Sequence, residues 1–412
     1  MTMTRSTPPL PPPALTTPDS STTSFITTTI LPVDPSSIHF TPSPSPSLPP
    51  NTHPFHSPTL RIADTTTLAN LTRASALLSH TAHPIAFPTE TVYGLGANAL
   101  SSPSVQSIFI AKSRPQDNPL IVHISSLTQL RTLLPPGHDI PDIYIPLINR
   151  FWPGPLTILL PLPPHSPLAK EVTAEQATFA VRMPKHPIAL ALAHMSGLPI
   201  AAPSANKSGC PSPTTAAHVW KDMQGRIELI LDGGQAEVGV ESTVVSGLCD
   251  PPRVLRPGGV TLEMLRQVGG VWGRGLIGVN GEEVPLVPGM KYRHYSPKAK
   301  VILYEQNTPP PTVDKLLSTS SSSSIGIIRT RTWGPNWSST LTAGTGGGAP
   351  PTIEELSLGT SGADISRGLF AALRELDERG VAVIHVEGIA EENEGLAVMN
   401  RLRKAAGEIV RR

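Results

Sequence analysis

Four polar segments of the chain carry side chains that could bind a substrate rich in phosphate. Their guanidinium, ammonium, hydroxyl and amide groups belong, in chain order, to Thr91; to Lys112, Arg114 and Asn118; to Ser204 and Asn206; and to Ser242 with Arg256. Cations that converge with hydroxyls and amides suit a polyphosphate, because each phosphate oxygen accepts charge-assisted hydrogen bonds. Taken singly, each of these residues is more typical of solvated surface. The chemistry therefore depends on a fold that brings the four segments together.

The first of these segments, residues 85–98, begins as a buried strand and continues into glycine. Its apolar start, Ile-Ala-Phe, predicts the strand, which Pro88 interrupts before the polar cluster Thr-Glu-Thr. Gly94 and Gly96 allow positive φ or a close approach of the backbone to a ligand. A Gly-x-Gly pattern alone is as typical of an ordinary turn. The polar cluster at the strand end therefore carries the prediction of a binding site.

Two common ways of organising catalysis are not evident in the sequence. It contains no Walker A pattern (GxxxxGK[ST]), so any phosphate site differs from a P-loop. No Ser-His or Cys-His pair of a nucleophile with its base stands out either. The polar segments instead favour catalysis by positioning and by neutralising charge on a phosphate chain.

Composition excludes several classes of protein. The chain has 412 residues and a net charge of +1, so there is no overall basic field for nucleic acid. Two cysteines, Cys210 and Cys249, are too few for a disulfide framework and fit a reducing compartment. No apolar run approaches the roughly 20 residues that span a bilayer. We expect a soluble cytoplasmic protein without a membrane segment.

Shifts in composition predict two folded domains with a tail. Residues 1–58 are rich in Pro, Ser and Thr and nearly uncharged, a composition that cannot offset its ordering entropy. Within this head, residues 24–33 are an exception that could add a strand to the next domain. We place the first domain at 59–268, a glycine-rich linker at 269–298 and a second domain at 299–412.

The head gives little sign of a targeting signal. Arg5 is the single Lys or Arg among the first sixty residues. A mitochondrial presequence is typically rich in Arg, so this composition gives it only weak support. An additional mitochondrial pool of the protein stays an open alternative.

Short apolar runs alternate with helical patterns along the first domain. Helices are predicted from Thr67, with Thr67 as the cap, from Ser102-Pro103, with Ser102 as the cap, and over 188–195. Strands are predicted at 85–87, 120–124, 156–160, 179–183, at the start of 198–206, and at 227–231, followed by a hairpin of 242–246 with 253–256. Because the alternation lacks a strict βαβ period, we expect an α/β domain with a twisted mixed sheet.

The second domain repeats the alternation on a smaller scale. Short β-branched runs at 301–304, 325–328 and 381–386 predict strands, and helical patterns lie at 364–378 and 395–406. Such an order favours a small Rossmann-like α/β domain.

The motifs, taken together and in order, resemble those of a known enzyme family. The chain contains PTETVYGLG, KSRPQDNPLIVHI, FAVRMP, APSANKSG and ESTVV, and later KYRHYSP and GLAVMNRLRK. This series is similar to the YrdC-type threonylcarbamoyl-AMP synthases in their two-domain form, a YrdC-like domain followed by a Rossmann-like one. The resemblance implies a nucleotidyltransferase that joins L-threonine, bicarbonate and ATP into threonylcarbamoyl-AMP and pyrophosphate. That product serves threonylcarbamoyladenosine modification beside the anticodon of tRNA.

The same resemblance implies a role for individual residues. The expected contacts to L-threonine are Thr91, His123, Arg182, Ala202 and Ser242. The expected contacts to ATP are Arg114, Asn118, Thr178, Ser204, Ser212, Arg256 and, from the linker, Tyr295. The catalytic set would be Lys112, Arg114, Ser204 and Asn206, in which Lys112 and Arg114 neutralise the triphosphate. Mg²⁺ bound with ATP is the expected cofactor.

Two of these residues have an alternative structural interpretation. His123 lies between Val122 and Ile124, where a core histidine is the default, and only the resemblance favours a ligand role. Arg182 lies inside an apolar strand and needs a carboxylate partner, which the threonine substrate would supply. Glu90 is expected only to brace its loop.

The linker segment around Tyr292-Arg-His-Tyr295 also has two interpretations. Aromatic and basic residues together could close over ATP as a lid, which excludes water from a labile adenylate. The alternative is a tether whose aromatic rings wedge the two domains together.

Partners and competing functions follow from the same residues. The expected partners are a downstream threonylcarbamoyl transferase complex and, as an open alternative, tRNA. One competing function is carbamoyl-adenylate chemistry on another acceptor, which the lack of added acylphosphatase-like and zinc-finger segments disfavours. Another is a non-catalytic RNA-binding module, suggested by the basic tail from Arg401 to Arg412 but disfavoured by the near-zero net charge.

Overall fold

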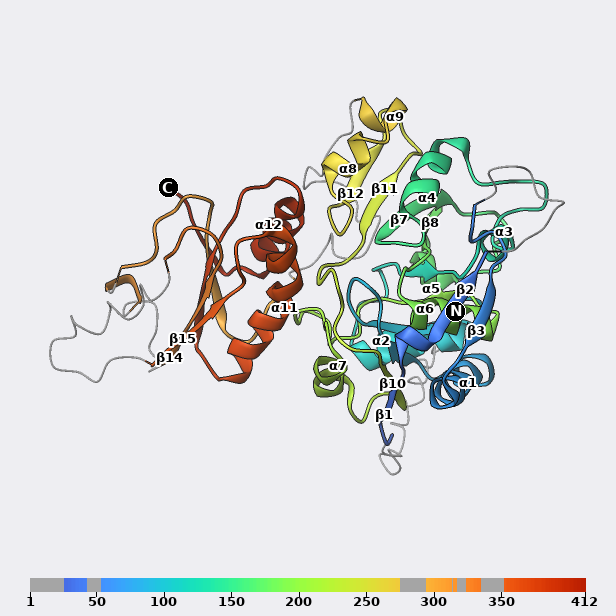
Figure 1. Cartoon of the computed structure of the whole chain (residues 1–412), viewed down its shortest axis with the longest axis horizontal. Coiled ribbons are helices and arrows are strands. Elements are labelled where there is room, and N and C mark those ends of the chain that lie inside the picture. The colour runs from blue at the N-terminus through green and yellow to red at the C-terminus, as the bar shows by residue number, and fades with distance from the viewer. Residues whose placement is uncertain (1–25, 43–52, 275–293, 313, 317–323, 335–351) are drawn as a thin grey trace, which may run out of the picture.

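The computed structural model describes residues 26–42, 53–274, 294–312, 314–316, 324–334 and 352–412. They form a ten-stranded sheet, a five-stranded sheet and a two-stranded ribbon. Figure 1 shows a larger body that holds the long sheet and a smaller one, in orange and red, that holds the five-stranded sheet. The predicted α/β fold with a smaller second α/β domain is confirmed. Among the described helices, none is long and apolar enough to cross a bilayer.

The large sheet is mixed, and its middle strands support the polar segments. The strand order is β1-β10-β4-β5-β9-β6-β8-β7-β11-β12. Parallel pairs such as β6 with β8 lie beside antiparallel pairs such as β7 with β8, as predicted. Most strands are short and almost wholly buried, which explains their continuous apolar runs. In this order the strands span Thr29–Pro32, Leu229–Asp232, Ile85–Phe87, Gly94–Asn98, Ile200–Ala201, Ile121–His123, Thr178–Arg182, Leu156–Pro161, Thr243–Ser246 and Arg253–Arg256.

Helices pack around this sheet. Two helix starts differ from the sequence prediction by one or more residues. The first helix, α1, is capped by the Asp64 carboxylate, which accepts the Thr67 N–H at 2.6 Å, whereas Thr67 itself lies inside the helix. The second, α2, is capped by Ser101 and not by Ser102. The helices of the first domain are α1 Thr65–His80, α2 Ser102–Lys112, α3 Leu127–Arg131, α4 Ile145–Phe151, α5 Lys170–Thr173, α6 Pro187–Ser196, α7 Ala216–Met223, α8 Leu262–Arg266 and α9 Gly270–Gly273, with 3-10 turns η1 Pro35–Ser37 and η2 Asp142–Tyr144.

Part of the predicted head belongs to the first domain. Strand β1 pairs in parallel with β10 at the edge of the large sheet, as suggested for residues 24–33. Strand β2, Ile38–Thr41, pairs antiparallel with β3, Thr59–Ile62. Val33 and Ile38 are buried in the same core as helix α1. The prediction that residues 1–58 form a disordered head is therefore wrong for 26–42 and for 53–58, because both segments pack on the first domain, the second through the buried His53 and through Phe55. Residues 1–25 and 43–52 lie outside the described chain.

The linker prediction also needs a correction at its start. Residues 269–274 include helix α9, whose Trp272 is buried and donates its indole N–H to the Ile143 carbonyl at 2.8 Å. This segment is packed on the first domain, because an indole ring buried there is held by both its apolar body and its N–H. Residues 275–293, which hold the glycine-rich part and Lys291 to Arg293, lie outside the described chain.

The second domain is built on a parallel sheet. Its strand order is β15-β14-β16-β13-β17, and every pair is parallel. The predicted helices are confirmed as α11, Gly362–Glu378, and α12, Glu394–Ala405. The sequence pattern does not predict β15 and β17, because both lie at sheet edges and are only partly buried. The strands are β13 Lys300–Tyr304, β14 Ser324–Arg329, β15 Thr352–Ser357, β16 Val383–Glu387 and β17 Glu408–Val410.

One carboxylate fills the loop that follows β14. The Glu387 side chain, buried at the end of β16, accepts backbone N–H groups from Thr330 at 2.6 Å, Arg331 at 3.2 Å and Trp333 at 3.1 Å. It also accepts the N–H and, at 2.6 Å, the hydroxyl of Thr332. Successive backbone N–H groups that point into one concavity form an anion-binding nest. Here the anion is the protein's own side chain.

Helices α11 and α12 form the face of the second domain that meets the first domain (Figure 1). Arg374 of α11 lies 2.7 Å from the Asp222 carboxylate on α7, and both side chains are almost wholly buried. The two backbones also approach closely at Gly239, where an added Cβ would lie 2.4 Å from the Cα of Arg367. The two domains are therefore docked by specific contacts.

Candidate functional site

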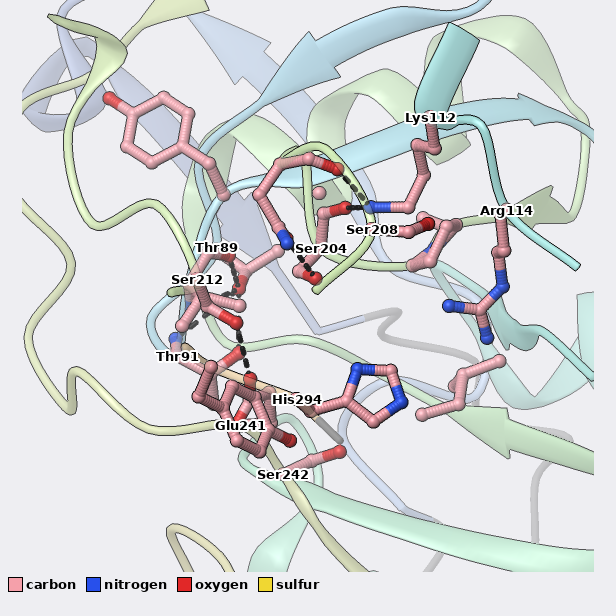
Figure 2. A pocket seen from close by; sticks show the side chains of 18 of the residues that line it. Thr89, Thr91, Lys112, Arg114, Ser204, Ser208, Ser212, Glu241, Ser242 and His294 are labelled. Atoms are coloured by element: carbon pink, nitrogen blue, oxygen red, sulfur yellow. Dashed lines mark hydrogen bonds between the residues drawn. The ribbon is translucent and has the colours of Figure 1, made fainter. Parts of the chain in front are cut away.

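The four polar segments meet in one pocket, whose space of about 700 Å³ includes the solvent at its mouth. Figure 2 shows that Lys112, Arg114, Ser204, Ser212, Glu241 and His294 surround the same space, although they come from distant parts of the chain. Twelve of the fourteen predicted site residues line this pocket. They are Thr91, Lys112, Arg114, His123, Arg182, Ala202, Ser204, Asn206, Ser212, Ser242, Arg256 and Tyr295.

Strand register places two of the predicted threonine contacts side by side. Strands β6 and β8 are parallel, and His123 is the register partner of Arg182. Because parallel strands end at the same edge of a sheet, both side chains are delivered to one end of the pocket. The Arg182 guanidinium donates to the Thr91 hydroxyl at 3.0 Å and to the Gly154 carbonyl at 3.1 Å. This end of the pocket is therefore ordered by Arg182.

The carboxylate partner of Arg182 is the protein's own Glu90. The Glu90 carboxylate lies 2.6 Å from a guanidinium nitrogen of Arg182, and both side chains are buried. Arg182 therefore has a carboxylate partner within the protein, as a buried cation requires, and an additional contact of Arg182 with the carboxylate of threonine stays a prediction. Glu90 does more than brace its loop.

His123 is a buried, neutral ring on the pocket wall. Burial, with the nearby Arg182 cation, lowers its pKa to about 3. Its Nδ1 lies 3.2 Å from the Ile121 carbonyl, and the ring meets Phe87 edge-on. The structure places it both in the core and on the pocket, so the two interpretations from the sequence are not exclusive.

Hydroxyl groups complete this end of the pocket. The Thr91 hydroxyl lies 2.8 Å from that of Thr89, and the Ser242 hydroxyl lies 2.8 Å from that of Thr157 on β7. Arg256 holds Ser242 from the other side, since its guanidinium donates to the Ser242 carbonyl at 2.9 Å. Two hydroxyl pairs and a guanidinium therefore set the geometry around Ser242 and Thr91.

Lys112 is engaged by the protein itself. It is the last residue of α2, and its ammonium donates to the backbone carbonyls of Ser204 and, at 2.6 Å, Asn206 (Figure 2). Burial, together with the nearby Arg114 cation, holds its pKa well below the ordinary value. Two of its three protons are taken by carbonyls, so its first effect is to shape the 204–206 loop. Neutralisation of phosphate by Lys112 stays a prediction.

Arg114 has a guanidinium nitrogen that the described part of the protein does not hydrogen-bond, so it can donate to a ligand. The chain turns at Ser113, which has φ of 51°, and this left-handed residue directs Arg114 into the pocket. Its guanidinium donates to the Asn118 and Pro119 carbonyls at 3.3 and 3.2 Å, and its Nε has no hydrogen-bond partner among the described residues. Burial lowers its pKa to about 10, so it remains charged at neutral pH.

Two predicted ATP contacts, Asn118 and Thr178, do not line this pocket. Strand β8 begins at Thr178, and Asn118 precedes the start of β6, so both residues lie at the opposite end of this parallel pair from His123 and Arg182. Strand direction is the reason, because residues at the two ends of a strand cannot share one edge. Yet the Asn118 amide nitrogen and the Thr178 hydroxyl are buried without a partner in the described structure, as is Arg114 Nε. Such orphan groups suit an extended polar ligand that continues past Arg114.

The 204–206 loop is held by its own polar groups. The Ser204 hydroxyl donates to the Asn206 side-chain oxygen at 2.5 Å. The Asn206 amide in turn donates to the carbonyls of Lys207 and Cys210 at 2.7 and 2.9 Å. The Ser204 backbone also bridges to Gly94, so the Gly-x-Gly segment and this loop are adjacent. Gly96 is required by packing, because an added Cβ would lie 2.5 Å from the Phe87 ring.

The pocket wall nearest the second domain contains residues that sequence reasoning did not select. They are Glu241, His294 and Cys210, besides Thr89 and Ser208. The Glu241 carboxylate accepts the Ser212 hydroxyl at 2.5 Å and is contacted by Arg401 of α12. Glu241 begins the ESTVV motif, so its position beside Ser242 was the signal that could have found it.

Tyr295 joins the pocket to the second domain. It lines the pocket, and its ring stacks on Phe370 of α11 with a centroid distance of 5.1 Å. Burial and the neighbouring Glu241 carboxylate raise its pKa. The structure therefore shows the tether interpretation directly for this residue, while closure over a ligand stays a prediction.

The chemistry of the pocket is that of a cationic, partly dehydrated cleft. Arg114 and Arg256 both remain charged, since burial lowers the pKa of each only to about 10. Among the described residues, there is no group of three or more His, Cys, Asp or Glu side chains that could hold a metal ion. The arrangement can bind a small zwitterion at the Arg182 end and a phosphate chain along the Arg114 side.

Both domains match known families. Residues 79–258 match the Sua5/YciO/YrdC family, described as "Telomere recombination". Residues 260–407 match the family described as "Threonylcarbamoyl-AMP synthase, C-terminal domain".

Similar proteins cover nearly the whole chain. A relative from Schizosaccharomyces pombe, named threonylcarbamoyl-AMP synthase, is 48% identical over 394 residues, which is 87% of this chain and 93% of the relative. One of the same name from Pyrococcus abyssi is 46% identical over 334 residues, 78% of this chain and 90% of the relative. The solved structure of P. abyssi Sua5 complexed with L-threonine has a TM-score of 0.72 and 39% identity, and the match covers 93% of this chain and 100% of that one. The chain belongs to the threonylcarbamoyl-AMP synthase family in its two-domain form.

Proposed function

We propose that the pocket makes threonylcarbamoyl-AMP from L-threonine, bicarbonate and ATP, with release of pyrophosphate. The observation that carries this proposal is the division of one pocket into two ends. Arg182, Thr91 and Ser242 form an end suited to an amino acid, and Arg114 leads away from it along a cationic wall. The names of the relatives and the L-threonine bound to the P. abyssi protein support the same assignment.

Catalysis in this proposal needs no protein nucleophile. Bicarbonate takes up a proton and loses water to give CO2, which the amine of threonine captures to form a carbamate as the amine releases a proton to water. A carbamate oxygen then attacks the α-phosphorus of ATP. The new P–O bond forms as the bond to the β-phosphate breaks, and pyrophosphate leaves. The protein holds the two reactants in line and neutralises charge on the phosphate chain, a role for Arg114 and Arg256. Ser204, Asn206 and Lys112 hold the loop between the two ends.

Magnesium fits this proposal as the partner of ATP. Glu241 is the one carboxylate among the pocket-lining residues of the described chain, and Ser212 and Arg401 already occupy it. The other lining groups are cations, hydroxyls and amides, which suit phosphate oxygens better than a divalent metal. The ion would therefore be held chiefly by the triphosphate, where it neutralises charge.

The downstream part of the proposal concerns partners. A threonylcarbamoyl transferase complex would consume the adenylate to modify tRNA, and a cytoplasmic location, as expected from the sequence, stays part of the proposal. Direct tRNA contact is a further alternative, and at the carboxyl terminus it would fall to the exposed Arg411 and Arg412, because Arg401 is buried against Glu241 and Arg403 is paired with Glu305 and Glu391.

The decisive experiment incubates the purified chain with ATP, bicarbonate and each amino acid in turn, and follows pyrophosphate and the mass of the adenylate product. Release should require both threonine and bicarbonate. Arg114→Ala and Ser204→Ala should reduce turnover strongly, and each should lower the free energy of unfolding by only about 1–3 kcal/mol, because each side chain is hydrogen-bonded within the pocket. Equal turnover with serine, or without an amino acid, would contradict the threonine assignment. Near-normal rates in either variant would contradict the placement of the phosphate chain.

A further inference from the structure

One side chain of the second domain reaches the wall of the pocket. Arg401 of α12 is fully buried, its Nε donates to Glu241 Oε2 at 3.0 Å, and a second guanidinium nitrogen lies 3.0 Å from the same oxygen. Its Nη1 donates to the Pro257 carbonyl. The guanidinium also lies over the Tyr295 ring, 5.8 Å from the centroid. Arg401 therefore contacts two pocket-lining residues from outside the first domain.

Glu241, the partner of Arg401, also contacts a second pocket-lining residue, Ser212. Glu241 uses its other oxygen, Oε1, to accept the Ser212 hydroxyl at 2.5 Å. Burial disfavours the charged form of Glu241, but the cations Arg401 and Arg256 hold the pKa of this carboxyl below its ordinary value. The carboxylate is thus charged and can only accept hydrogen bonds. Ser212 must be the donor in this contact.

The direction of that hydrogen bond decides what Ser212 can recognise. A serine hydroxyl has one proton and two lone pairs. Because the proton is committed to Glu241, the oxygen of Ser212 can only accept from a ligand in the pocket. A phosphate oxygen, which is itself an acceptor, does not suit this position. The matching ligand atom is an N–H or O–H on the nucleoside part of ATP.

A purely structural role for Arg401 explains less of the geometry. The domain interface already has a buried cation, Arg374, whose carboxylate partner Asp222 does not line the pocket. Arg403, two residues along α12, pairs within its own domain with Glu305 and Glu391. Of these three arginines, Arg401 is the one whose carboxylate partner lines the pocket. Because a buried charge without a partner destabilises the fold, Arg401 and Glu241 each require the other.

We propose that Arg401 is a positioning residue for nucleotide recognition: it fixes the Glu241 carboxylate, which takes the Ser212 proton and leaves Ser212 as an acceptor for a hydrogen-bond donor of the nucleoside. The inference rests on the proposed function, since it takes ATP as the ligand. It also gives the second domain a part in substrate selection, because α12 holds Arg401 in the position that makes Ser212 a hydrogen-bond acceptor. The two donor sources in ATP are the adenine amino group and the ribose hydroxyls.

Binding measurements on the full chain test the proposal without relying on turnover. Calorimetry compares ATP with inosine triphosphate, which has an oxygen in place of the amino group, and with 2′-deoxy- and 3′-deoxy-ATP. The unaltered chain should prefer ATP to one of the three analogues by about tenfold, the usual effect of one hydrogen bond to a buried group. Arg401→Gln should remove that preference, and Arg401→Lys, which keeps the charge, should restore part of it.

A thermodynamic cycle separates positioning from stability. Ser212→Ala should remove the same preference, and the double variant Arg401→Gln/Ser212→Ala should bind ATP no more weakly than either single variant. Arg403→Gln and Arg374→Gln are the controls, for a cation on the same helix and at the same interface, and both should keep the preference even where stability falls. Threonine affinity should be unchanged in Arg401→Gln.

The outcomes are distinct. Additive effects of Arg401→Gln and Ser212→Ala, an equal loss of preference in Arg374→Gln, or no preference among the analogues in the unaltered chain would overturn this inference alone. A failure of the unaltered chain to bind ATP would overturn it together with the proposed function. Binding that follows the cycle, with no adenylate product, would support the inference and contradict the proposed reaction.

Discussion

The buried pair of Glu90 with Arg182 gives a prediction whose size follows from its environment. Glu90→Gln removes one charge and keeps the volume, which leaves the Arg182 cation buried without its carboxylate. Both side chains of the pair are almost wholly buried, at 3% and 4% exposure. Breaking such a pair costs about 3–5 kcal/mol, and the value expected here is near 3 because the 2.6 Å contact is an ion pair without hydrogen-bond geometry. In the domain that holds β4 and β8, that corresponds to a midpoint shift of roughly 6–12 °C.

The assay is urea unfolding of the full chain, followed by near-UV circular dichroism with and without saturating threonine. If threonine places its carboxylate at Arg182, threonine should stabilise Glu90→Gln by more than it stabilises the unaltered chain, since the substrate then supplies the missing charge. The matched control is Glu378→Gln, which breaks the exposed pair with Lys221 and should cost less than about 1 kcal/mol.

Two results would refute this reasoning. A loss of stability in Glu90→Gln no larger than in the control would show that the buried pair is not an obligatory partner of Arg182. An equal gain from threonine in Glu90→Gln and the unaltered chain would place the substrate carboxylate away from Arg182.

Three further predictions concern pH, docking and the amino-terminal strand. The pKa of His123 is about 3 in the folded chain and ordinarily 6.5, so the unfolded chain takes up a proton first, and stability present above pH 6.5 is lost as pH falls towards 3. At pH 5 the loss amounts to about 2 kcal/mol. His123→Gln should remove this amount from the difference in unfolding free energy between pH 7.5 and pH 5.0, measured with urea, and an unchanged difference would refute the prediction. Gly239→Ala would place a Cβ 2.4 Å from the Cα of Arg367 and should loosen the docking of the two domains, measured by small-angle scattering. Gly197→Ala, also at positive φ but with no neighbour within 4 Å of the added Cβ, should leave the docking unchanged. Equal scattering curves for the two variants would contradict this prediction. Deleting residues 1–20 should leave activity intact, but deleting 1–33 should cost at least about 2 kcal/mol in urea unfolding, because β1 and the buried Val33 are lost; equal stability of both truncations would show that β1 adds nothing.

Much of the fold and most of the pocket could be predicted because the informative signals are local. In the sequence, the buried strands β6 and β8 each appear as an apolar run with one polar residue next to its last position, His123 or Arg182. Since both runs point the same way in a parallel pair, their ends meet. The motifs shared with the family then predicted which residues of the neighbouring loops belong to the pocket.

The remainder depends on contacts between residues far apart in the chain. The ion pair of Arg182 with Glu90 joins strand β8 to the loop between β4 and β5, and the ion pair of Arg401 with Glu241 joins two domains. No periodicity near these residues predicts either pair. The strand role of residues 29–32 likewise depends on the open edge of β10. Composition alone cannot show that such an edge is available.

In the described part of the second domain, the nest of residues 330–333 already holds an anion, the Glu387 carboxylate. A carboxylate tethered by its own strand is present at an effective concentration of millimolar or more, and it is already desolvated and aligned with the N–H groups of residues 330–333. A free phosphate group would have to displace it and then leave it buried without a partner. The Rossmann-like sheet therefore keeps the shape of a nucleotide-binding scaffold while its anion position is occupied from within. Binding of a nucleotide phosphate at this nest is therefore disfavoured, because it would require displacement of the Glu387 carboxylate.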